Sequence, residues 1–257
     1  MQIYATAPDS FPFFFELGGL RLPAHFVFEA LAYAVGFRLY LWQRARSGDF
    51  LTTSTRWTVV AAGIVGAALG SKGLYLLGDP ATTAQHLSDP FYLMGGKTIV
   101  GGLLGGWVAV ELVKRRIGVR RATGDLFVIP TAIGIAIGRI GCFLSGLPDN
   151  TYGIETALPF GVDFGDGVGR HPTQLYELAF LLALAGSLSG SWTSRLREGD
   201  LFKLFMASYL TFRLVIEIIK PRPTLAGLSA IQWACVLGLA YLTLCFLRRR
   251  QEEIVST

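Results

Sequence analysis

The sequence predicts an all-α membrane protein with seven transmembrane helices, forming a single integral-membrane domain over residues 1–257. Hydrophobic residues make up 52% of the chain and charged residues only 16%, whereas charged residues reach about 25% of a typical soluble domain. Seven segments are mainly apolar over the roughly 20 residues that a helix needs to cross a bilayer. The basic residues gather in short clusters between these segments, which is typical of membrane topology and argues against a nucleic-acid partner.

The apolar segments cover residues 25–43, 57–78, 95–113, 124–146, 173–192, 201–219 and 227–247. The first begins with His25 and Glu29, which are one helical turn apart and therefore share a face. The second and third are rich in glycines four residues apart, a spacing that lets helix backbones approach closely in lipid. We expect these glycines to pack helices together; they are Gly66 and Gly70 in the second segment and Gly101, Gly102, Gly105 and Gly106 in the third.

The later segments carry ionisable groups near one end. The fourth holds Arg139 towards its C-terminal end. In the sixth, Tyr209, Arg213 and Glu217 are spaced four residues apart, so they form one stripe on a helix. The longest polar connection, residues 147–172, separates the fourth and fifth segments, and we expect it to be an outer loop.

The basic clusters predict the orientation of the seven helices. They lie at residues 44–56, 114–121, 195–197 and 248–250, and the alternate connections are poorer in Lys and Arg. Because positive residues stay on the cytoplasmic side, the N-terminus is expected outside and the C-terminus in the cytoplasm. This topology places one set of polar residues in the outer half of the membrane: His25, Glu29, Lys97, Arg139, His171, Gln174, Glu177, Tyr209, Arg213, Glu217, Lys220 and Gln232.

Ionisable residues inside a membrane usually face a cavity or a pathway, so their default interpretation is functional. The alternative is that they form ion pairs that lock helices together, such as Arg139 with Glu177 or Arg213 with Glu217. If Lys97, Arg139, Arg213 and Lys220 share one cavity, the cations outnumber the neighbouring carboxylates. The planar arginine fork matches phosphate oxygens. An anionic ligand reached from the outer leaflet is most simply a phospholipid head group.

The cysteines and histidines predict neither a disulfide framework nor a metal site. Cys142 lies close to Arg139 in sequence, and an adjacent positive charge lowers a thiol pKa, but we expect Cys142 to be a packing residue. No second pair of ligands stands at metal-binding spacing beside His25 or His171. We therefore expect no metal and no cofactor.

Four motifs resemble those of the bacterial prolipoprotein diacylglyceryl transferases. They are Gly-Arg-Ile-Gly-x-Phe at 138–143, Arg-His-Pro-Thr-Gln-Leu-Tyr-Glu at 170–177, Tyr-x-x-x-Arg-x-x-x-Glu at 209–217, and the glycine motif at 95–105. The resemblance covers most of the chain from about residue 60 onward. It implies a multi-pass protein of the bacterial cytoplasmic (inner) membrane, with its site facing the outer leaflet and the periplasm.

The resemblance also implies an activity and a set of site residues. The family transfers the diacylglyceryl group of phosphatidylglycerol, an anionic phospholipid, to a cysteine thiol in the signal peptide of a prolipoprotein, and glycerol phosphate is released. Arg139 and Arg213 would hold the phosphate, and Tyr209 and Glu217 would orient them. The expected substrate-binding residues are Lys97, His171, Gln174, Glu177, His25, Glu29 and Gln232.

The sequence departs from the family pattern at several positions, and a glutamate that the family has shortly beyond the second asparagine position is also absent. Val100 replaces a histidine that is a candidate for deprotonating the thiol, and Cys142 and Ser145 replace asparagines. The phospholipid half of the site is retained, whereas the thiol-acceptor half is altered. Two alternatives therefore stay open: a related phospholipid-dependent transferase with a non-lipoprotein acceptor, and a non-catalytic phospholipid-binding protein. A transporter is disfavoured because the inner halves of the helices lack a polar path.

Overall fold

The computed structural model describes residues 11–255, without the side chains of residues 249–250 and 252–255. The chain forms two compact units. The first comprises Met1–Gly48, Thr123–Phe205 and Ile219–Pro221, and the second comprises Asp49–Ala122, Met206–Ile218 and Arg222–Thr257. Each unit is described by itself.

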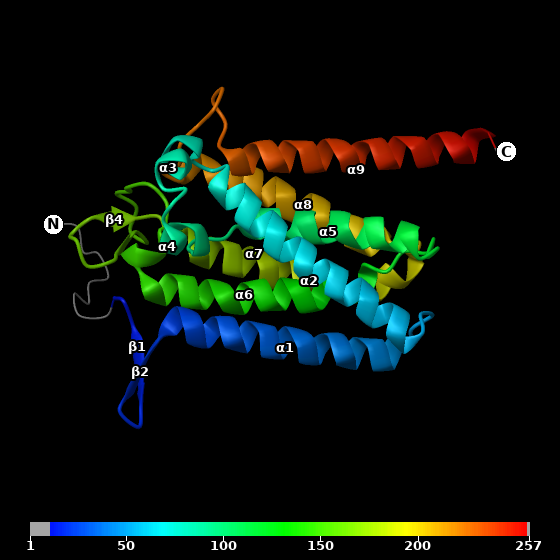
Figure 1. The fold of residues 1–257 in the computed structure, drawn as a ribbon, viewed down its shortest axis with the longest axis horizontal. Coiled ribbons are helices and arrows are strands. Elements are labelled where there is room, and N and C mark those ends of the chain that lie inside the picture. Colours follow the sequence, from blue (N-terminus) through cyan, green and yellow to red (C-terminus); the bar gives the residue numbers. More distant parts are fainter. Residues whose placement is uncertain (1–10, 256–257) are drawn as a thin grey trace. The chain divides into compact units, whose positions relative to one another are not determined.

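The first unit is built on α1 (Ala24–Ser47), α6 (Val128–Ser145) and α7 (Thr173–Leu188). Helix α6 packs against both α1 and α7, and Figure 1 shows α1 running alongside α6. Near the site, Gly141 allows a close approach, because a Cβ atom there would lie 2.8 Å from the Cβ of Phe28. The start of α1 therefore lies against the end of α6.

A β-hairpin that the sequence analysis did not predict precedes α1. Strands β1 (Phe14–Leu17) and β2 (Leu20–Pro23) are antiparallel and joined by Gly18 and Gly19, both with positive φ. Positive φ at both turn residues is typical of a tight two-residue hairpin. The backbone N–H of Phe13 donates to the carbonyl of Leu144 at 2.9 Å, which ties this segment to the end of α6.

The connection between α6 and α7 contains η2 (Leu147–Asp149) and the short antiparallel strands β3 (Val162–Asp163) and β4 (Gly169–Arg170). It is anchored to the start of α7, since the Thr173 hydroxyl donates to the carbonyl of Thr151 at 2.5 Å. Two short 3-10 helices, η1 (Asp125–Phe127) and η3 (Ser191–Arg195), complete the first unit together with the first residues of α8 (Asp200–Ile216).

The second unit contains α2 (Thr53–Leu76), α3 (Pro80–Gln85), α4 (Pro90–Met94), α5 (Ile99–Arg116), the rest of α8, the first residues of η4 (Glu217–Ile219), and α9 (Ala230–Val255). Helix α5 packs against α2 and α9. A Cβ atom at Gly66 would lie 2.6 Å from the carbonyl oxygen of Gly105, and a Cβ atom at Gly70 would lie 2.8 Å from the Cα atom of Gly105. The prediction that these glycines pack helices is confirmed.

Each of the seven apolar segments overlaps a helix, so the described part of the chain is mostly helical, as predicted. Within the described residues, three helices are long and apolar enough to cross a membrane: Thr53–Leu76, Asp125–Ser145 and Ala230–Arg248. Several helix ends differ from the expected segment ends by a few residues, and one of these differences moves a predicted site residue. The third segment was expected to begin at residue 95, but α5 begins at Ile99, because Gly96 has a φ of 58° that interrupts the helix. Lys97 therefore precedes the helix.

Candidate active site

The first unit contains a buried ion pair between Arg139 on α6 and Glu177 on α7. Nη2 of Arg139 donates to Oε1 of Glu177 at 3.1 Å, and Nε lies 3.0 Å from Oε2. The two side chains are only 7% and 1% exposed. Because both side chains are buried, this ion pair holds the guanidinium group in position against α7.

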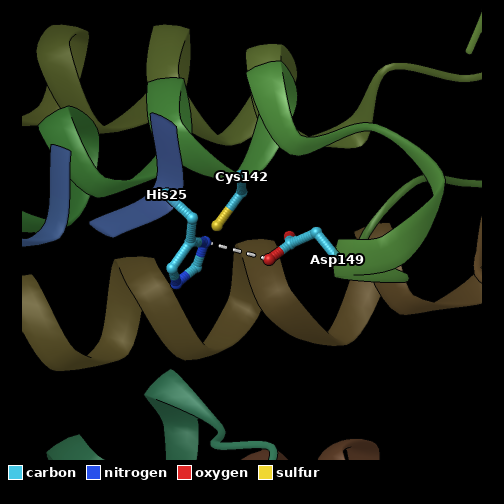
Figure 2. Close-up of side chains that lie close together, drawn as sticks. All are labelled: His25, Cys142 and Asp149. Carbon is cyan, nitrogen blue, oxygen red and sulfur yellow. Dashed lines mark ion pairs between the residues drawn. The ribbon is translucent and has the colours of Figure 1, made fainter. Parts of the chain in front are cut away.

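Three further side chains lie next to this pair, at the end of α6 and the start of α1. Nη1 of Arg139 donates to Sγ of Cys142 at 3.6 Å. Figure 2 shows the thiol of Cys142, the imidazole of His25 and the carboxylate of Asp149 pointing towards one another. Their ligand-type atoms all lie within 4.8 Å of one another, and Nδ1 of His25 is 3.1 Å from Oδ1 of Asp149.

The imidazole and the carboxylate of this cluster have further polar neighbours. Nε2 of His25 lies 3.6 Å from Oε2 of Glu29, and the hydroxyl of Tyr33 donates to Oε1 of Glu29 at 3.1 Å. The hydroxyl of Thr151 donates to Oδ2 of Asp149 at 2.5 Å. His25 and Glu29 thus share one face of α1, as predicted, and Asp149 of η2 lies against His25.

The start of α7 contributes His171 and Gln174. Nδ1 of His171 lies 3.1 Å from the hydroxyl of Tyr176. The amide of Gln174 is 1% exposed, and neither its nitrogen nor its oxygen has a hydrogen-bond partner within residues 11–255. A buried polar group without a partner costs about 1–3 kcal/mol. Gln174 is therefore a buried amide whose bonding capacity the described protein does not satisfy.

In the second unit, the predicted stripe of the sixth segment is formed. Tyr209 is fully buried, and Nη2 of Arg213 lies 2.8 Å from Oε2 of Glu217. Helix α8 ends at Ile216, but the four-residue spacing still brings these two groups together. Nε of Arg222 lies 3.5 Å from Oε1 of the same glutamate. Two guanidinium groups thus share one carboxylate.

The remaining predicted residues of the second unit have different surroundings. Gln232 and Ser229 form a reciprocal cap at the start of α9, in which Oε1 of Gln232 accepts from the backbone N–H of Ser229 at 2.9 Å. Its Nε2 donates to the carbonyl of Leu214 at 3.3 Å. These bonds make Gln232 a helix-capping residue. Lys97 is exposed, and Val100 is buried and offers no titratable group.

The structure therefore brings His25, Glu29, Arg139 and Glu177 into one connected set. Both arginines of the prediction have a glutamate within about 3 Å, so the ion pairs considered as the alternative are present and the argument from excess cations is weaker. Sequence reasoning missed Asp149 and Arg222 and set Cys142 aside as packing. The predicted topology did indicate that His25 lies near Cys142, because it placed the start of the first helix and the end of the fourth on the same side of the membrane.

Within the described residues, three helices are long and apolar enough to cross a membrane, and each unit contains a buried arginine–glutamate pair. Both features are typical of integral membrane proteins. The family model for prolipoprotein diacylglyceryl transferase matches residues 12–248. The phosphatidylglycerol–prolipoprotein diacylglyceryl transferase of Clostridium tetani is 32% identical over 234 residues, covering 86% of this chain and 91% of that protein. The proteins of the same name from Vibrio vulnificus strain YJ016 and Nitratidesulfovibrio vulgaris strain DP4 are 30% and 32% identical over 241 and 225 residues. Those alignments cover 88% and 82% of this chain, and 85% and 83% of the two relatives.

The chain belongs to the prolipoprotein diacylglyceryl transferase family. It is accordingly an enzyme of the diacylglyceryl transferase type.

Proposed function

We propose that this protein transfers the diacylglyceryl group of phosphatidylglycerol to the cysteine thiol of a prolipoprotein. The observation that carries this proposal is Arg139, a buried arginine held at two points by Glu177 inside the region that matches the family. Relatives that share about 30% of the sequence over most of the chain are named for these two substrates.

The proposed reaction exchanges one bond for another at the glyceryl carbon. The cysteine thiol loses its proton to a base, and its sulfur forms a C–S bond with the glyceryl carbon. The C–O bond to the phosphate breaks, and glycerol phosphate leaves with an additional negative charge. Cations held in place before the reaction stabilise such developing charge efficiently, because they need no reorganisation.

We assign phosphate binding to Arg139 and to Arg213. Glu177 and Glu217 are proposed to orient these guanidinium groups, and the buried Tyr209 lies one turn before Arg213 on the same helix. Arg222, which shares Glu217 with Arg213, adds positive charge in the second unit.

We assign Gln174 to the polar part of the lipid substrate, because its buried amide has no hydrogen-bond partner among the described residues. His171, at the start of the same helix, is proposed to line the entrance for substrate. Lys97, which is exposed before α5, is kept among the proposed substrate-binding residues. Gln232 is left out of the substrate contacts because both ends of its amide make structural hydrogen bonds.

We further propose that the seven helices at the predicted segments all cross the bacterial inner membrane, as one integral domain with the N-terminus outside and the C-terminus in the cytoplasm. The alternating basic clusters support this orientation, as do the three helices of sufficient length and apolarity. In this topology the site residues face the outer leaflet, where phosphatidylglycerol and the prolipoprotein signal peptide are reached.

Gln174 offers a test that separates function from folding. The substitution Gln174→Leu removes an unsatisfied amide, so the protein should be at least as stable as the wild type. Transfer should nevertheless fall about tenfold or more, since one lost hydrogen bond of roughly 1.4 kcal/mol in the transition state is a factor of ten in rate. The assay mixes purified protein, phosphatidylglycerol and a peptide with a lipobox cysteine, and follows peptide and lipid by mass spectrometry.

The matched control is Gln43→Leu. Gln43 also has a buried amide oxygen without a hydrogen-bond partner among residues 11–255, but it lies near the end of α1 that is far from His25. This variant should transfer at the wild-type rate. Full activity of Gln174→Leu would contradict the assignment of Gln174. Phosphatidylglycerol consumption without peptide modification would instead indicate a different acceptor.

A further inference from the structure

The cluster of His25, Cys142 and Asp149 has the composition of a metal site. It joins the first turn of α1, the last turn of α6 and the end of η2, all within the first unit. Figure 2 shows Nδ1 of the imidazole, the thiol sulfur and a carboxylate oxygen directed towards a common point. Imidazole, thiolate and carboxylate are the three protein ligands that Zn²⁺ uses.

The spacing of the ligand atoms suits a tetrahedral ion. Bonds of about 2.0–2.3 Å to Zn²⁺ give ligand–ligand edges of roughly 3.3–3.6 Å. The edge between Nδ1 of His25 and Oδ1 of Asp149 is 3.1 Å, and all ligand atoms lie within 4.8 Å of one another. Closing the sulfur onto the ion therefore needs a movement on the order of 1 Å, which rotation of a side chain provides.

A hydrogen-bonded acid–base pair of His25 and Asp149 is the competing interpretation, and the 3.1 Å contact between Nδ1 and Oδ1 is short enough for it. That pair alone does not account for the thiol of Cys142, whose sulfur lies within 4.8 Å of both groups. A shared cation accounts for all three side chains.

Each of the three groups also has an outer partner of the kind that supports a metal ligand. Glu29 faces the second nitrogen of His25 at 3.6 Å, Thr151 donates to the second oxygen of Asp149, and Arg139 donates to the sulfur of Cys142. Metal-binding histidines usually direct their other nitrogen to a carboxylate, and ligating carboxylates are themselves hydrogen-bonded.

We propose that His25, Cys142 and Asp149 bind one divalent d-block cation, with Zn²⁺ as the preferred occupant. A neutral imidazole, a thiolate and a carboxylate together compensate the charge of a divalent ion. The thiolate selects against Mg²⁺ and Ca²⁺, which take oxygen ligands. The His25 side chain is 35% exposed, so the cluster is open at the protein surface. Three protein ligands leave a fourth tetrahedral position open, which is the arrangement of a catalytic zinc site.

The open position suggests a role that rests on the proposed function. A free cysteine thiol has a pKa of about 8.5, so it is mostly protonated at neutral pH. A thiol that coordinates the metal loses its proton to water and binds as the thiolate. The acceptor cysteine would thereby become a nucleophile, although Val100 supplies no base. The sulfur would then form the C–S bond as the C–O bond to phosphate breaks.

The test is a cobalt titration of the purified full-length protein, prepared in detergent without a polyhistidine tag. Co²⁺ takes the same ligands as Zn²⁺ and gives a thiolate charge-transfer band in the near ultraviolet. The wild type should bind one equivalent with this band, and Zn²⁺ should displace it. Cys142→Ser should lose the band, whereas Cys245→Ser, a cysteine in α9 outside the cluster, should keep it.

A second variant addresses the outer partners. Thr151→Val should still show the charge-transfer band, but with an affinity about 10–100-fold weaker, which is the usual effect of losing an outer hydrogen bond. Binding of less than one equivalent by folded wild-type protein overturns the proposal. So does a band that persists unchanged in Cys142→Ser, because the metal is then bound elsewhere.

The role is tested separately from the site. Adding a lipobox peptide should shift the cobalt spectrum, and the same peptide with serine in place of cysteine should not. A band with no response to the peptide keeps the metal site and rejects the thiol-binding role. A spectral shift with the cysteine peptide but no transfer of lipid supports the metal site and the thiol-binding role, and contradicts the proposed function.

Discussion

The substitution Glu177→Gln tests the buried ion pair with Arg139. Both partners are almost fully buried, so the variant leaves a guanidinium charge without its carboxylate. Removing one partner of a buried pair typically costs about 3–5 kcal/mol. The pair of Arg170 and Asp166 is as short, at 2.7 Å, but lies in an exposed loop. Asp166→Asn should therefore cost no more than about 1 kcal/mol.

Stability would be measured by unfolding both variants in the same detergent, following the aromatic circular dichroism. Replacing both partners of the buried pair, in the double variant Arg139→Met with Glu177→Leu, should recover most of the stability lost by Glu177→Gln, because apolar pairs often replace buried ion pairs without loss. The double variant should still fail to transfer lipid, because it lacks the phosphate-binding arginine.

Two results would refute this reasoning. If Glu177→Gln is no more destabilising than Asp166→Asn, the pair does not hold an otherwise uncompensated buried charge. If the double variant folds and transfers the diacylglyceryl group at the wild-type rate, the pair only locks α6 to α7, and Arg139 has no role in binding phosphate.

Three further predictions concern packing, capping and pH. Gly70→Ala should destabilise the second unit by about 1–3 kcal/mol, because the added methyl group overpacks the contact with α5. The control Gly73→Ala has open space for its methyl group and should be stabilising by up to about 1 kcal/mol. Equal unfolding midpoints for the two variants would contradict the close approach of α2 and α5. Asp125 accepts hydrogen bonds from the backbone N–H groups of Gly199 and Phe202 at the start of α8, at 2.7 and 2.9 Å. Asp125→Ala should therefore lower the free energy of unfolding by about 1 kcal/mol in the same assay. An unchanged unfolding midpoint would show that this cap is not formed. The hydrogen bond from Arg170 holds the pKa of Asp166 below its ordinary value. The ionised Asp166 therefore stabilises the folded state above pH ~4, and this stabilisation is lost as the pH falls through the lower pKa of the folded state. Chemical shifts of the Asp166 carboxyl carbon that titrate at the ordinary pKa would contradict this prediction.

The helical scaffold was predictable because it is determined by long apolar segments. The seven segments coincide with helices, since a stretch of about 20 apolar residues has few ways to satisfy its backbone other than a helix. The glycines at 66, 70 and 105 were also interpretable, because only a residue without a side chain permits the observed approach of α2 and α5. The end positions were less predictable, as the late start of α5 after Gly96 shows.

Local spacing predicted one part of the site and could not predict another. Arg213 and Glu217 are four residues apart, so their contact follows from helical geometry. The contact of His25 with Asp149 joins groups that are far apart in sequence, and it depends on how η2 turns back over the start of α1. No periodicity reports such a turn, which is why Cys142 was interpreted as a packing residue.

The N-terminal hairpin left a signal that was overlooked. The run Leu17-Gly18-Gly19-Leu20 contains two glycines between apolar residues, and both adopt the positive φ that a tight turn requires. This hairpin matters for the site, because Phe13 beside it contacts the end of α6 through a backbone hydrogen bond. The start of α1, and with it His25, is held in place by this short element.

The central claim is that one phosphatidylglycerol is consumed for each cysteine modified. The most direct measurement uses phosphatidylglycerol with an isotope label in the head-group glycerol, together with a lipobox peptide and the purified protein. Equal amounts of labelled glycerol phosphate and of peptide carrying a diacylglyceryl thioether are expected. Intact lipid and unmodified peptide, beside a family member that is active in the same mixture, would contradict it.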